Sequence, residues 1–209
     1  MTVVPARPHP ARAGAFILDW DGVLADTRLD FLPLRRKYFG GKIIPLIEAA
    51  EGLSPPERSE VLAEIRRVEM EGAERAVAVK GARELIEWLR AARRPWAVVS
   101  RNCRDSILLA AEKCGVALPP VLLSREDPYA KPDPRVLALA AERLGVRLSD
   151  CVMVGDFIYD LQAAKNAGIP GVLVGSQGAE KREWEALADF SYATVEDFVR
   201  DLNAAAVTA

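Results

Sequence analysis

The chain has 209 residues, half of them hydrophobic, and a formal net charge of −2 at neutral pH. This length and composition are sufficient for one globular domain with a modest insertion. The charge balance shows no basic surplus of the kind used in nucleic-acid binding, and no stretch reaches the roughly 18 apolar residues that a membrane span requires. We therefore predict a cytoplasmic protein whose partners are neither nucleic acids nor membranes.

The N-terminal stretch, residues 1–13, contains prolines and basic residues but no apolar core of a signal peptide, and we predict that it is a disordered leader. It contains His9, the only histidine of the chain, so a mechanism that needs a histidine base or ligand is nearly excluded. The three cysteines are too few and too irregularly spaced for a zinc site or a disulfide framework. The chemistry must therefore use carboxylates, lysine, hydroxyl groups or a cofactor.

The first predicted strand is the apolar run Phe16–Leu18, which is followed by two acids, Asp19 and Asp21. After it, residues 29–50 and 54–72 have helical patterns with no strand between them. Ser54 is a candidate N-cap, with proline at the first helical position. We predict that residues 28–78 form an all-helical insertion after the first strand.

From residue 79 onward, short apolar runs alternate with helical patterns. The predicted strands are residues 95–100, 121–123, 150–156 and 171–175, and the predicted helices are 82–93, 104–115, 131–145 and 158–168. The tail, residues 189–202, predicts a last short strand and a closing helix with Phe198 and Leu202 packed inward. Near-continuous apolar runs are typical of parallel strands that helices cover on both faces. The predicted fold class is α/β, with a doubly wound, mostly parallel sheet formed by residues 14–27 and 79–209.

Polar side chains follow the predicted strands at the points where they end. Asp19 and Asp21 follow the first strand, Ser100 the second and Asp156 the fourth, with Asp160 close behind; Lys131 lies in the loop after the third. Each residue alone fits an ordinary role, as a turn residue, a helix cap or a solvated lysine. Because the carboxyl ends of parallel strands meet at one edge of a sheet, their joint occurrence favours a single site there.

The charges of this predicted site indicate a metal. Four carboxylates at one edge repel one another, and Lys131 alone cannot balance them, whereas a divalent ion can. Ligands that are all oxygen indicate a hard ion, and we predict Mg²⁺. A metal, a lysine and a hydroxyl group around one point suit a phosphoryl group. A carboxylate nucleophile would form an aspartyl-phosphate, and a second carboxylic acid would then move the protons.

At these residues the sequence resembles the haloacid dehalogenase superfamily of phosphatases and phosphotransferases. The segment "DWDGVLADT" resembles its first motif, "VVS" ending at Ser100 its second, Lys131 in "AKPDP" its third and "VGDFIYD" its fourth. The resemblance covers about residues 15–203. It implies that residues 28–78 are the helical cap of the phosphoglycolate-phosphatase-like branch, closing over a core made of residues 14–27 and 79–209.

The resemblance also implies a role for each site residue. Asp19 would be the nucleophile and a Mg²⁺ ligand, and Asp21 the general acid and base, with its backbone carbonyl on the metal. Asp156 would bind Mg²⁺, with Asp160 supporting it directly or through water. The remaining contacts would go to the phosphoryl group, from Ser100, Lys131 and the backbone at Gly22.

One departure concerns the second motif. The family often has Asn directly after the hydroxyl residue, whereas here Arg101 intervenes before Asn102. Arg101 is therefore a candidate phosphate or substrate contact, and the role of Asn102 stays open. The basic segment "RRKYFGGK" offers Arg35, Arg36, Lys37 and Lys42 as further anion contacts, against the alternative of a solvated helix face.

The leading function is a Mg²⁺-dependent phosphatase that hydrolyses a small phosphorylated metabolite through an aspartyl-phosphate. A phosphotransferase of the phosphoglucomutase type and a non-catalytic member that binds a phospholigand are the alternatives. Dehalogenation is disfavoured by Asp21, which that reaction does not need. Phosphonate cleavage would need a cap lysine, for which only Lys37 and Lys42 are available. No pattern in the sequence predicts an oligomeric state.

Overall fold

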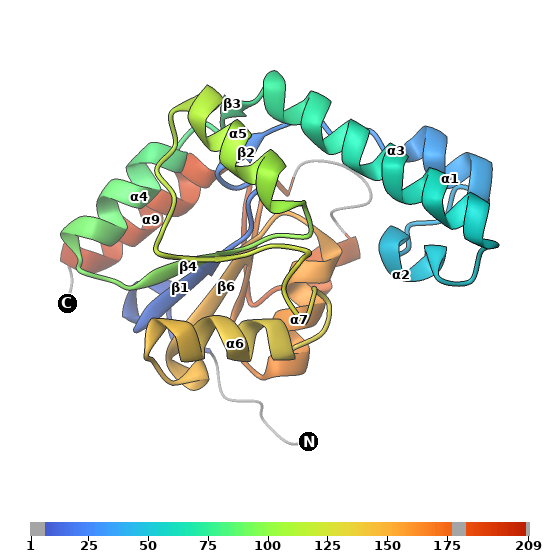
Figure 1. Cartoon of the computed structure of the whole chain (residues 1–209). Helices are drawn as coiled ribbons and strands as arrows, with labels where there is room; N and C mark the ends of the chain where they lie inside the picture. Colours follow the sequence, from blue (N-terminus) through green and yellow to red (C-terminus); the bar gives the residue numbers. More distant parts are fainter. Residues whose placement is uncertain (1–6, 177–182, 208–209) are drawn as a thin grey trace, which may run out of the picture.

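A six-stranded parallel sheet forms the centre of the computed structural model, which describes residues 7–176 and 183–207 (Figure 1). Its strand order is β5-β4-β1-β6-β7-β8. The strands are β1 (Ala15–Leu18), β4 (Trp96–Val99), β5 (Val121–Leu123), β6 (Cys151–Gly155), β7 (Gly171–Val174) and β8 (Phe190–Tyr192). All neighbouring strands pair in parallel, and the predicted doubly wound α/β fold is confirmed.

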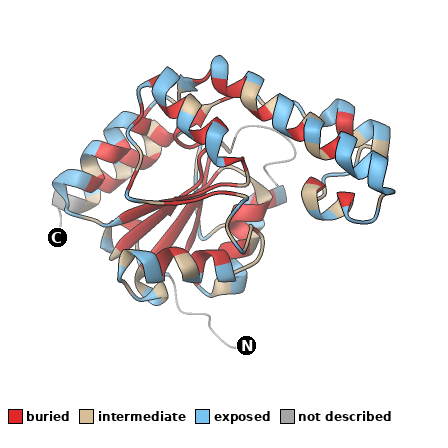
Figure 2. Cartoon of the chain, viewed as in Figure 1, coloured by how far each residue is buried: buried red, intermediate tan, exposed pale blue. Residues whose placement is uncertain are grey.

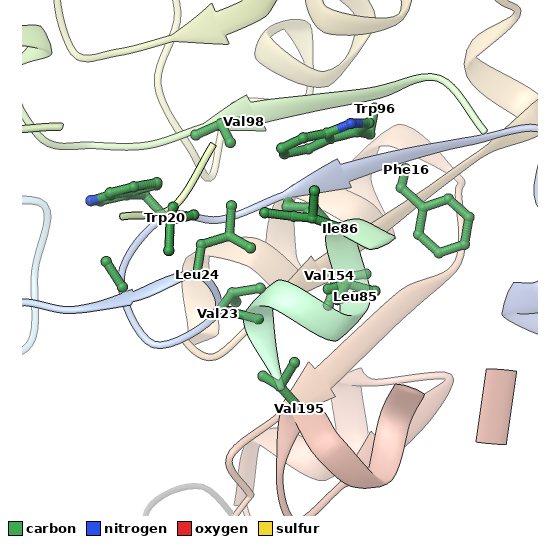
Figure 3. Close-up of a cluster of buried hydrophobic side chains, with 14 of the residues drawn as sticks. Phe16, Trp20, Val23, Leu24, Leu85, Ile86, Trp96, Val98, Val154 and Val195 are labelled. Atoms are coloured by element: carbon green, nitrogen blue, oxygen red, sulfur yellow. The ribbon is translucent and has the colours of Figure 1, made fainter. Parts of the chain in front are cut away.

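Helices cover both faces of this sheet, as the near-continuous apolar strands predict. They are α4 (Ala82–Ala91), α5 (Arg104–Cys114), α6 (Arg135–Leu144), α7 (Ile158–Ala167) and α9 (Val195–Val207). Phe16 and Leu18 of β1 belong to the cluster of buried side chains from α4, α5 and α9, part of which Figure 3 shows. Ile17 belongs to the second cluster, with α6 and α7. The four inner strands, β4, β1, β6 and β7, are buried on both faces, whereas the edge strand β8 is only partly buried (Figure 2).

The order of the strands creates a switch point at β1. The chain moves from β1 to β4 and β5 on one side, and then returns to β6, β7 and β8 on the other. The connection that follows β1 runs toward β4, and the connection that follows β6 runs the other way, toward β7. Open α/β sheets bind ligands at such a point, beside the carboxyl ends of the two strands. Asp19 follows β1 at this point, and Asp156 follows β6.

The segment between β1 and α4 contains three helices, which lie to one side of the sheet edge (Figure 1). They are α1 (Leu32–Phe39), α2 (Leu46–Ala50) and α3 (Pro55–Glu74). Where the sequence predicts one helical stretch over 29–50, the structure has two helices, because Gly40 and Gly41 adopt positive φ angles of 61° and 78° and end α1. Helix α3 begins after Ser54, as predicted, with a capping box completed by Glu57.

A short antiparallel ribbon flanks these helices, and the sequence did not predict it. Strand β2 (Ala25–Asp26) pairs with β3 (Val77–Ala78). The segment that leads into the three helices is therefore hydrogen-bonded to the segment that leads out of them. Two-residue strands are too short to show a periodicity.

Helix α6 begins later than the predicted residue 131. Its first residue is Arg135, whose backbone N–H donates to the Asp133 carboxylate.

The N-terminal stretch departs from the predicted disordered leader. Residues 1–6 lie outside the described residues, but Pro10–Arg12 form a short 3₁₀-helix. His9 accounts for this order, since its Nε2 lies 2.7 Å from Asp201 of α9 and its ring packs edge-on against Phe190. Within the described ranges, no helix combines the length and apolarity needed to cross a bilayer.

A buried ion pair joins α3 to the sheet edge. The Glu69 side chain is 2% exposed, lies 2.6 Å from Arg125 in the loop after β5 and accepts a hydrogen bond from the Cys103 backbone N–H. Burial raises the pKa of Glu69, and the positive charge of Arg125 opposes that shift. Arg125, together with the hydrogen bond from Cys103, therefore favours the ionised form of Glu69.

We expect Arg125→Met to lower the free energy of unfolding by about 3 kcal/mol, because it leaves the buried Glu69 carboxylate without its cation. Arg67→Met is the matched control on α3. In the described part of the chain the exposed Arg67 pairs with the half-buried Glu64 and the exposed Glu71, and its loss is expected to cost less than about 1 kcal/mol. Equilibrium denaturation in urea measures both. Equal losses for the two variants would contradict the account.

Candidate active site

Asp19 stands where the buried strand β1 ends. Its backbone N–H donates to the carbonyl of Val154 on β6, at 2.9 Å, so the sheet itself fixes its position. Its Oδ1 accepts a hydrogen bond from the backbone N–H of Trp20, at 2.7 Å. Asp19 is only 9% exposed. These contacts fix the position of its carboxylate at the switch point of the sheet.

Lys131 reaches this carboxylate from the loop after β5. Its Nζ lies 2.7 Å from Oδ1 of Asp19 and 2.6 Å from Oδ1 of Asp160, and its side chain is 2% exposed. Burial disfavours the ammonium charge, but the attraction of Asp160 and Asp19 outweighs it and raises the Lys131 pKa. The two acids therefore favour the charged form of the buried Lys131.

Asp21 lies close by, but its surroundings differ. Burial raises its pKa to about 7, the negative charge of Asp19 adds to that shift, and hydrogen bonds from Thr27 and Asn102 oppose it. The Thr27 hydroxyl donates to Oδ1 and the Asn102 amide donates to Oδ2. Asp21 can therefore hold or release a proton near neutral pH, as an acid–base group must.

Thr27 and Asn102 are the two site residues whose function sequence reasoning missed. Thr27 closes the segment "DWDGVLADT", and Asn102 follows the hydroxyl residue after one intervening position. Both were therefore visible in the motifs, but only the fold shows that they hold opposite oxygens of the same carboxylate.

Three carboxylates form a cluster that suits a divalent metal. Oxygen atoms of Asp19, Asp156 and Asp160 all lie within 4.8 Å of one another. An all-carboxylate donor set fits a hard cation such as Mg²⁺, which keeps several waters. The side chain of Asp21 is not in this cluster, so its predicted contact with the metal would have to come from the backbone carbonyl.

Two glycines make room for these acids. A Cβ at Gly22, whose φ is +72°, would lie 2.2 Å from the carboxyl carbon of Asp156. A Cβ at Gly155 would lie equally close, at 2.2 Å, to that of Asp160. Any side chain at either position would displace a carboxylate.

Ser100 and Arg101 directly follow β4 and lie at the same edge of the sheet as the acids. Ser100 is buried, and its Oγ accepts a hydrogen bond from the backbone N–H of Asn102. Arg101 bridges two parts of the molecule: its guanidinium donates to the Lys131 carbonyl, lies 2.6 Å from Glu48 of α2 and stands 5.3 Å over the Tyr159 ring. That either residue binds phosphate stays a prediction.

A cavity of about 430 Å³ lies over the acids, between the sheet edge and the helices α1 to α3. Its core side includes Asp19, Asp21, Ser100 and Lys131. Its far side is formed by the helical segment, with Arg35, Leu46, Ile47 and Ile65 among the lining residues. A ligand there would touch both the clustered acids and the inserted helices.

Comparison with known proteins identifies the family. Residues 13–168 match haloacid dehalogenase-like hydrolases. The chain belongs to the haloacid dehalogenase-like hydrolase family. It is therefore a hydrolase, and the family resemblance seen in the sequence motifs is confirmed.

Individual members of the family show how far the similarity extends. The chain is 28% identical to pyrophosphatase PpaX of Bacillus velezensis over 75% of this chain and 81% of the relative. It is 27% identical to phosphoglycolate phosphatase of Xanthomonas campestris over 76% of this chain and 81% of that protein. A hydrolase from Pseudomonas syringae has the same fold, with a TM-score of 0.76, 22% identity and coverage of 91% of this chain and 98% of that one.

Proposed function

We propose that this haloacid dehalogenase-like hydrolase is a Mg²⁺-dependent phosphatase, acting on a small phosphate monoester through an aspartyl-phosphate. The observation that carries the proposal is the contact of Asp19 with the buried Lys131, beside the carboxylate cluster and at the base of the cavity. The relatives named as a pyrophosphatase and a phosphoglycolate phosphatase support a phosphatase activity.

The metal would be held by the carboxylates of Asp19 and Asp156, by the backbone carbonyl of Asp21, and by Asp160 directly or through water. When bound, Mg²⁺ offsets the negative charge of the acids and of the phosphoryl group. Lys131 supplies a second fixed positive charge, already in contact with Asp19 and Asp160. Together these cations would let a phosphate dianion approach a carboxylate nucleophile.

In the first step an oxygen of Asp19 attacks phosphorus, and the bond from phosphorus to the leaving oxygen breaks. Asp21, protonated at the start because its pKa is raised to about 7, gives its proton to that oxygen. In the second step Asp21 takes a proton from water, whose oxygen attacks phosphorus and releases phosphate and the Asp19 carboxylate. Ser100 and Arg101 would hold the phosphoryl oxygens through both steps. The Gly22 backbone N–H, which the sequence motif offered as a further phosphate contact, donates instead to the Ala25 carbonyl at 2.9 Å.

A phosphotransferase would share the first step and return the phosphoryl group to a substrate hydroxyl instead of water. Incubation with a sugar phosphate and Mg²⁺, followed by quantification of free phosphate and of phosphorylated products, separates the two. Release of one phosphate per substrate consumed supports the phosphatase. If isomerised or newly phosphorylated sugar forms without free phosphate, the protein is a phosphotransferase and the phosphatase proposal is wrong.

The metal requirement gives the direct test of the site. Metal-free protein is expected to hydrolyse p-nitrophenyl phosphate at least about 100-fold more slowly than protein with Mg²⁺, because the clustered acids then repel the substrate.

Asp156→Asn should raise the Mg²⁺ concentration for half-maximal rate by about 10-fold or more, since it removes a charged ligand. Asp105→Asn, an exposed acid of α5, is the control. Undiminished hydrolysis in a chelator would refute the metal dependence.

A further inference from the structure

The peptide unit between Asn102 and Cys103, just after β4, is held at both of its polar groups. Its carbonyl accepts a hydrogen bond from the backbone N–H of Arg125, at 3.1 Å. Its N–H donates to Oε2 of Glu69, also at 3.1 Å. Buried peptide groups need such partners, but these two come from separate parts of the fold, the loop after β5 and the inserted helix α3.

The two residues that hold this peptide unit are also bonded to each other. The Arg125 guanidinium donates to Oε1 of Glu69, at 2.6 Å. The other acid near Arg125 is Glu126, which is half exposed and lies farther away, at 3.8 Å. The three contacts form a closed ring, from the carbonyl of residue 102 through Arg125 and Glu69 back to the N–H of residue 103. Each contact in the ring restrains the others, so the peptide unit has one position and one orientation.

The side chain of Asn102 leads from this ring to the candidate acid–base group. Its amide donates to Oδ2 of Asp21, and its backbone N–H donates to Oγ of Ser100, at 3.1 Å. The backbone of Asn102 is therefore fixed before, at and after the residue, by Ser100, Arg125 and Glu69 in turn. A side chain on so rigid a backbone can hold its partner in a single geometry.

Glu69 is placed for this role rather than for contact with a substrate or for attachment of α3. Both of its carboxylate oxygens are already engaged, and the side chain is 2% exposed. Two exposed ion pairs, Arg66 with Asp105 and Glu74 with Lys113, join α3 to α5 without touching the peptide unit (Figure 1). A buried ion pair is also weak evidence for stability, since apolar residues of the same volume often do as well.

We propose that Glu69 and Arg125 are positioning residues for the acid–base step, acting through Asn102. By its hydrogen bond to Asp21, Asn102 holds that carboxyl within reach of the leaving oxygen. This inference rests on the proposed phosphatase function for the role of Asp21. Proton transfer requires such reach, and a displacement of about 1 Å can cost about 100-fold in rate. Helix α3 then contributes to the chemistry, and does not only cover the site.

Two substrates of similar shape, measured with Mg²⁺, test the effect on proton transfer. p-Nitrophenolate leaves without a proton, whereas the leaving group of phenyl phosphate benefits from one, so the readout is kcat/KM for p-nitrophenyl phosphate divided by kcat/KM for phenyl phosphate. Glu69→Gln should raise this ratio by about 5- to 10-fold, because glutamine has one acceptor oxygen and cannot serve both Cys103 and Arg125. Glu74→Gln, the same change in an exposed ion pair of α3, should keep the wild-type ratio. An unchanged ratio in Glu69→Gln, or an equal rise in Glu74→Gln, would overturn the proposal.

Combined variants show whether the effect passes through Asn102. In the Asn102→Ala background, Glu69→Gln should change the ratio by less than about 2-fold, because the amide that it positions is absent. Effects that multiply would mean that Glu69 does not act through Asn102, and would overturn the proposal. Arg125→Met removes the same ion pair from the other side and should raise the ratio as Glu69→Gln does, whereas Arg125→Lys, which keeps a cation, should raise it less. An unchanged ratio in Arg125→Met would overturn the assignment of Arg125.

A spectroscopic readout of Asn102 does not depend on turnover. The asparagines of the chain are Asn102, Asn166 and Asn203, so protein labelled with ¹⁵N-asparagine has a simple spectrum of side-chain amides, in which Asn102→Ala identifies the resonances of Asn102. Asp21→Ala gives their position without the acceptor. Glu69→Gln should move them toward that position, and Glu74→Gln should leave them in place. Resonances that stay at the wild-type position in Glu69→Gln would overturn the proposal.

The two readouts separate the inference from the function on which it rests. If neither aryl phosphate is hydrolysed but the Asn102 amide responds to Glu69→Gln alone, the phosphatase proposal fails and the positioning of Asn102 by Glu69 stands. If both are hydrolysed, and neither the ratio nor the amide responds to Glu69→Gln, the inference fails and the phosphatase proposal stands. Thermal melting of each variant verifies that it is folded at the assay temperature.

Discussion

Replacement of Asp19 by Asn is expected to lower the turnover of phosphate monoesters by about 10⁴-fold or more, which is the scale of losing a covalent nucleophile. The amide nitrogen cannot attack phosphorus, and the neutral side chain no longer carries the charge that Lys131 contacts at 2.7 Å. Steady-state hydrolysis of p-nitrophenyl phosphate measures the loss. Asp105→Asn on α5 should retain wild-type turnover.

The fold is expected to survive this substitution. Asn has the shape of Asp and can still accept from the Trp20 backbone N–H, while Asp160 continues to pair with Lys131 at 2.6 Å. Removal of one acid also relieves repulsion within the carboxylate cluster. A loss of activity without a fall in melting temperature therefore reports on chemistry.

Trapping of the intermediate decides whether Asp19 is the nucleophile. Wild-type protein quenched in acid during turnover of a ³²P-labelled monoester should retain covalent phosphate, and peptide mapping should place it on Asp19. Asp19→Asn should retain none. Phosphate on another residue, or an Asp19→Asn variant with substantial turnover, would exclude the aspartyl-phosphate mechanism at this position.

The strand ends of the core could be predicted because two local signals coincide there. A buried parallel strand is a short apolar run, and β1 and β6 each finish such a run at an acid, Asp19 and Asp156. Parallel pairing then places those ends at one edge, without knowledge of any side-chain contact. The approach of Asp160 and Lys131 to Asp19 follows from the same topology.

What the sequence did not predict depends on contacts between distant segments. No periodicity distinguishes Arg35 from Arg36, since both are basic residues of one helix, and only the placement of α1 over the cavity separates them. The ordering of His9 likewise requires Asp201 of α9, far along the chain. The hydrogen bonds of Thr27 and Asn102 to Asp21 depend on how their loops meet. Such placements come from packing, which local patterns do not encode.

Asp21→Asn is expected to affect substrates according to their leaving group. For an alkyl phosphate, the alkoxide needs a proton as it departs, so loss of the acid should lower kcat/KM by about 10²- to 10⁴-fold. p-Nitrophenolate leaves without a proton, so the first step on p-nitrophenyl phosphate should be affected much less. Asn at position 21 can still bond to Thr27 and Asn102, which keeps the local geometry.

The pH dependence of the wild-type protein provides a second readout of the same group. The carboxyl must carry its proton to act as the acid, and its pKa is raised to about 7 by burial. The kcat/KM for an alkyl phosphate should therefore fall as the pH rises above 7, where Asp21 is ionised in the free enzyme. The residual activity of Asp21→Asn should lack this decline.

The second step makes the test decisive, because the base that activates water is the same residue. In Asp21→Asn the aspartyl-phosphate should form from p-nitrophenyl phosphate and then persist. Stopped-flow absorbance would record a burst of about one p-nitrophenolate per active site followed by slow turnover. An equal loss on both substrates with no burst would instead indicate that Asp21 serves only to position Asp19 or the metal, and the proton transfer would have to be assigned to another group.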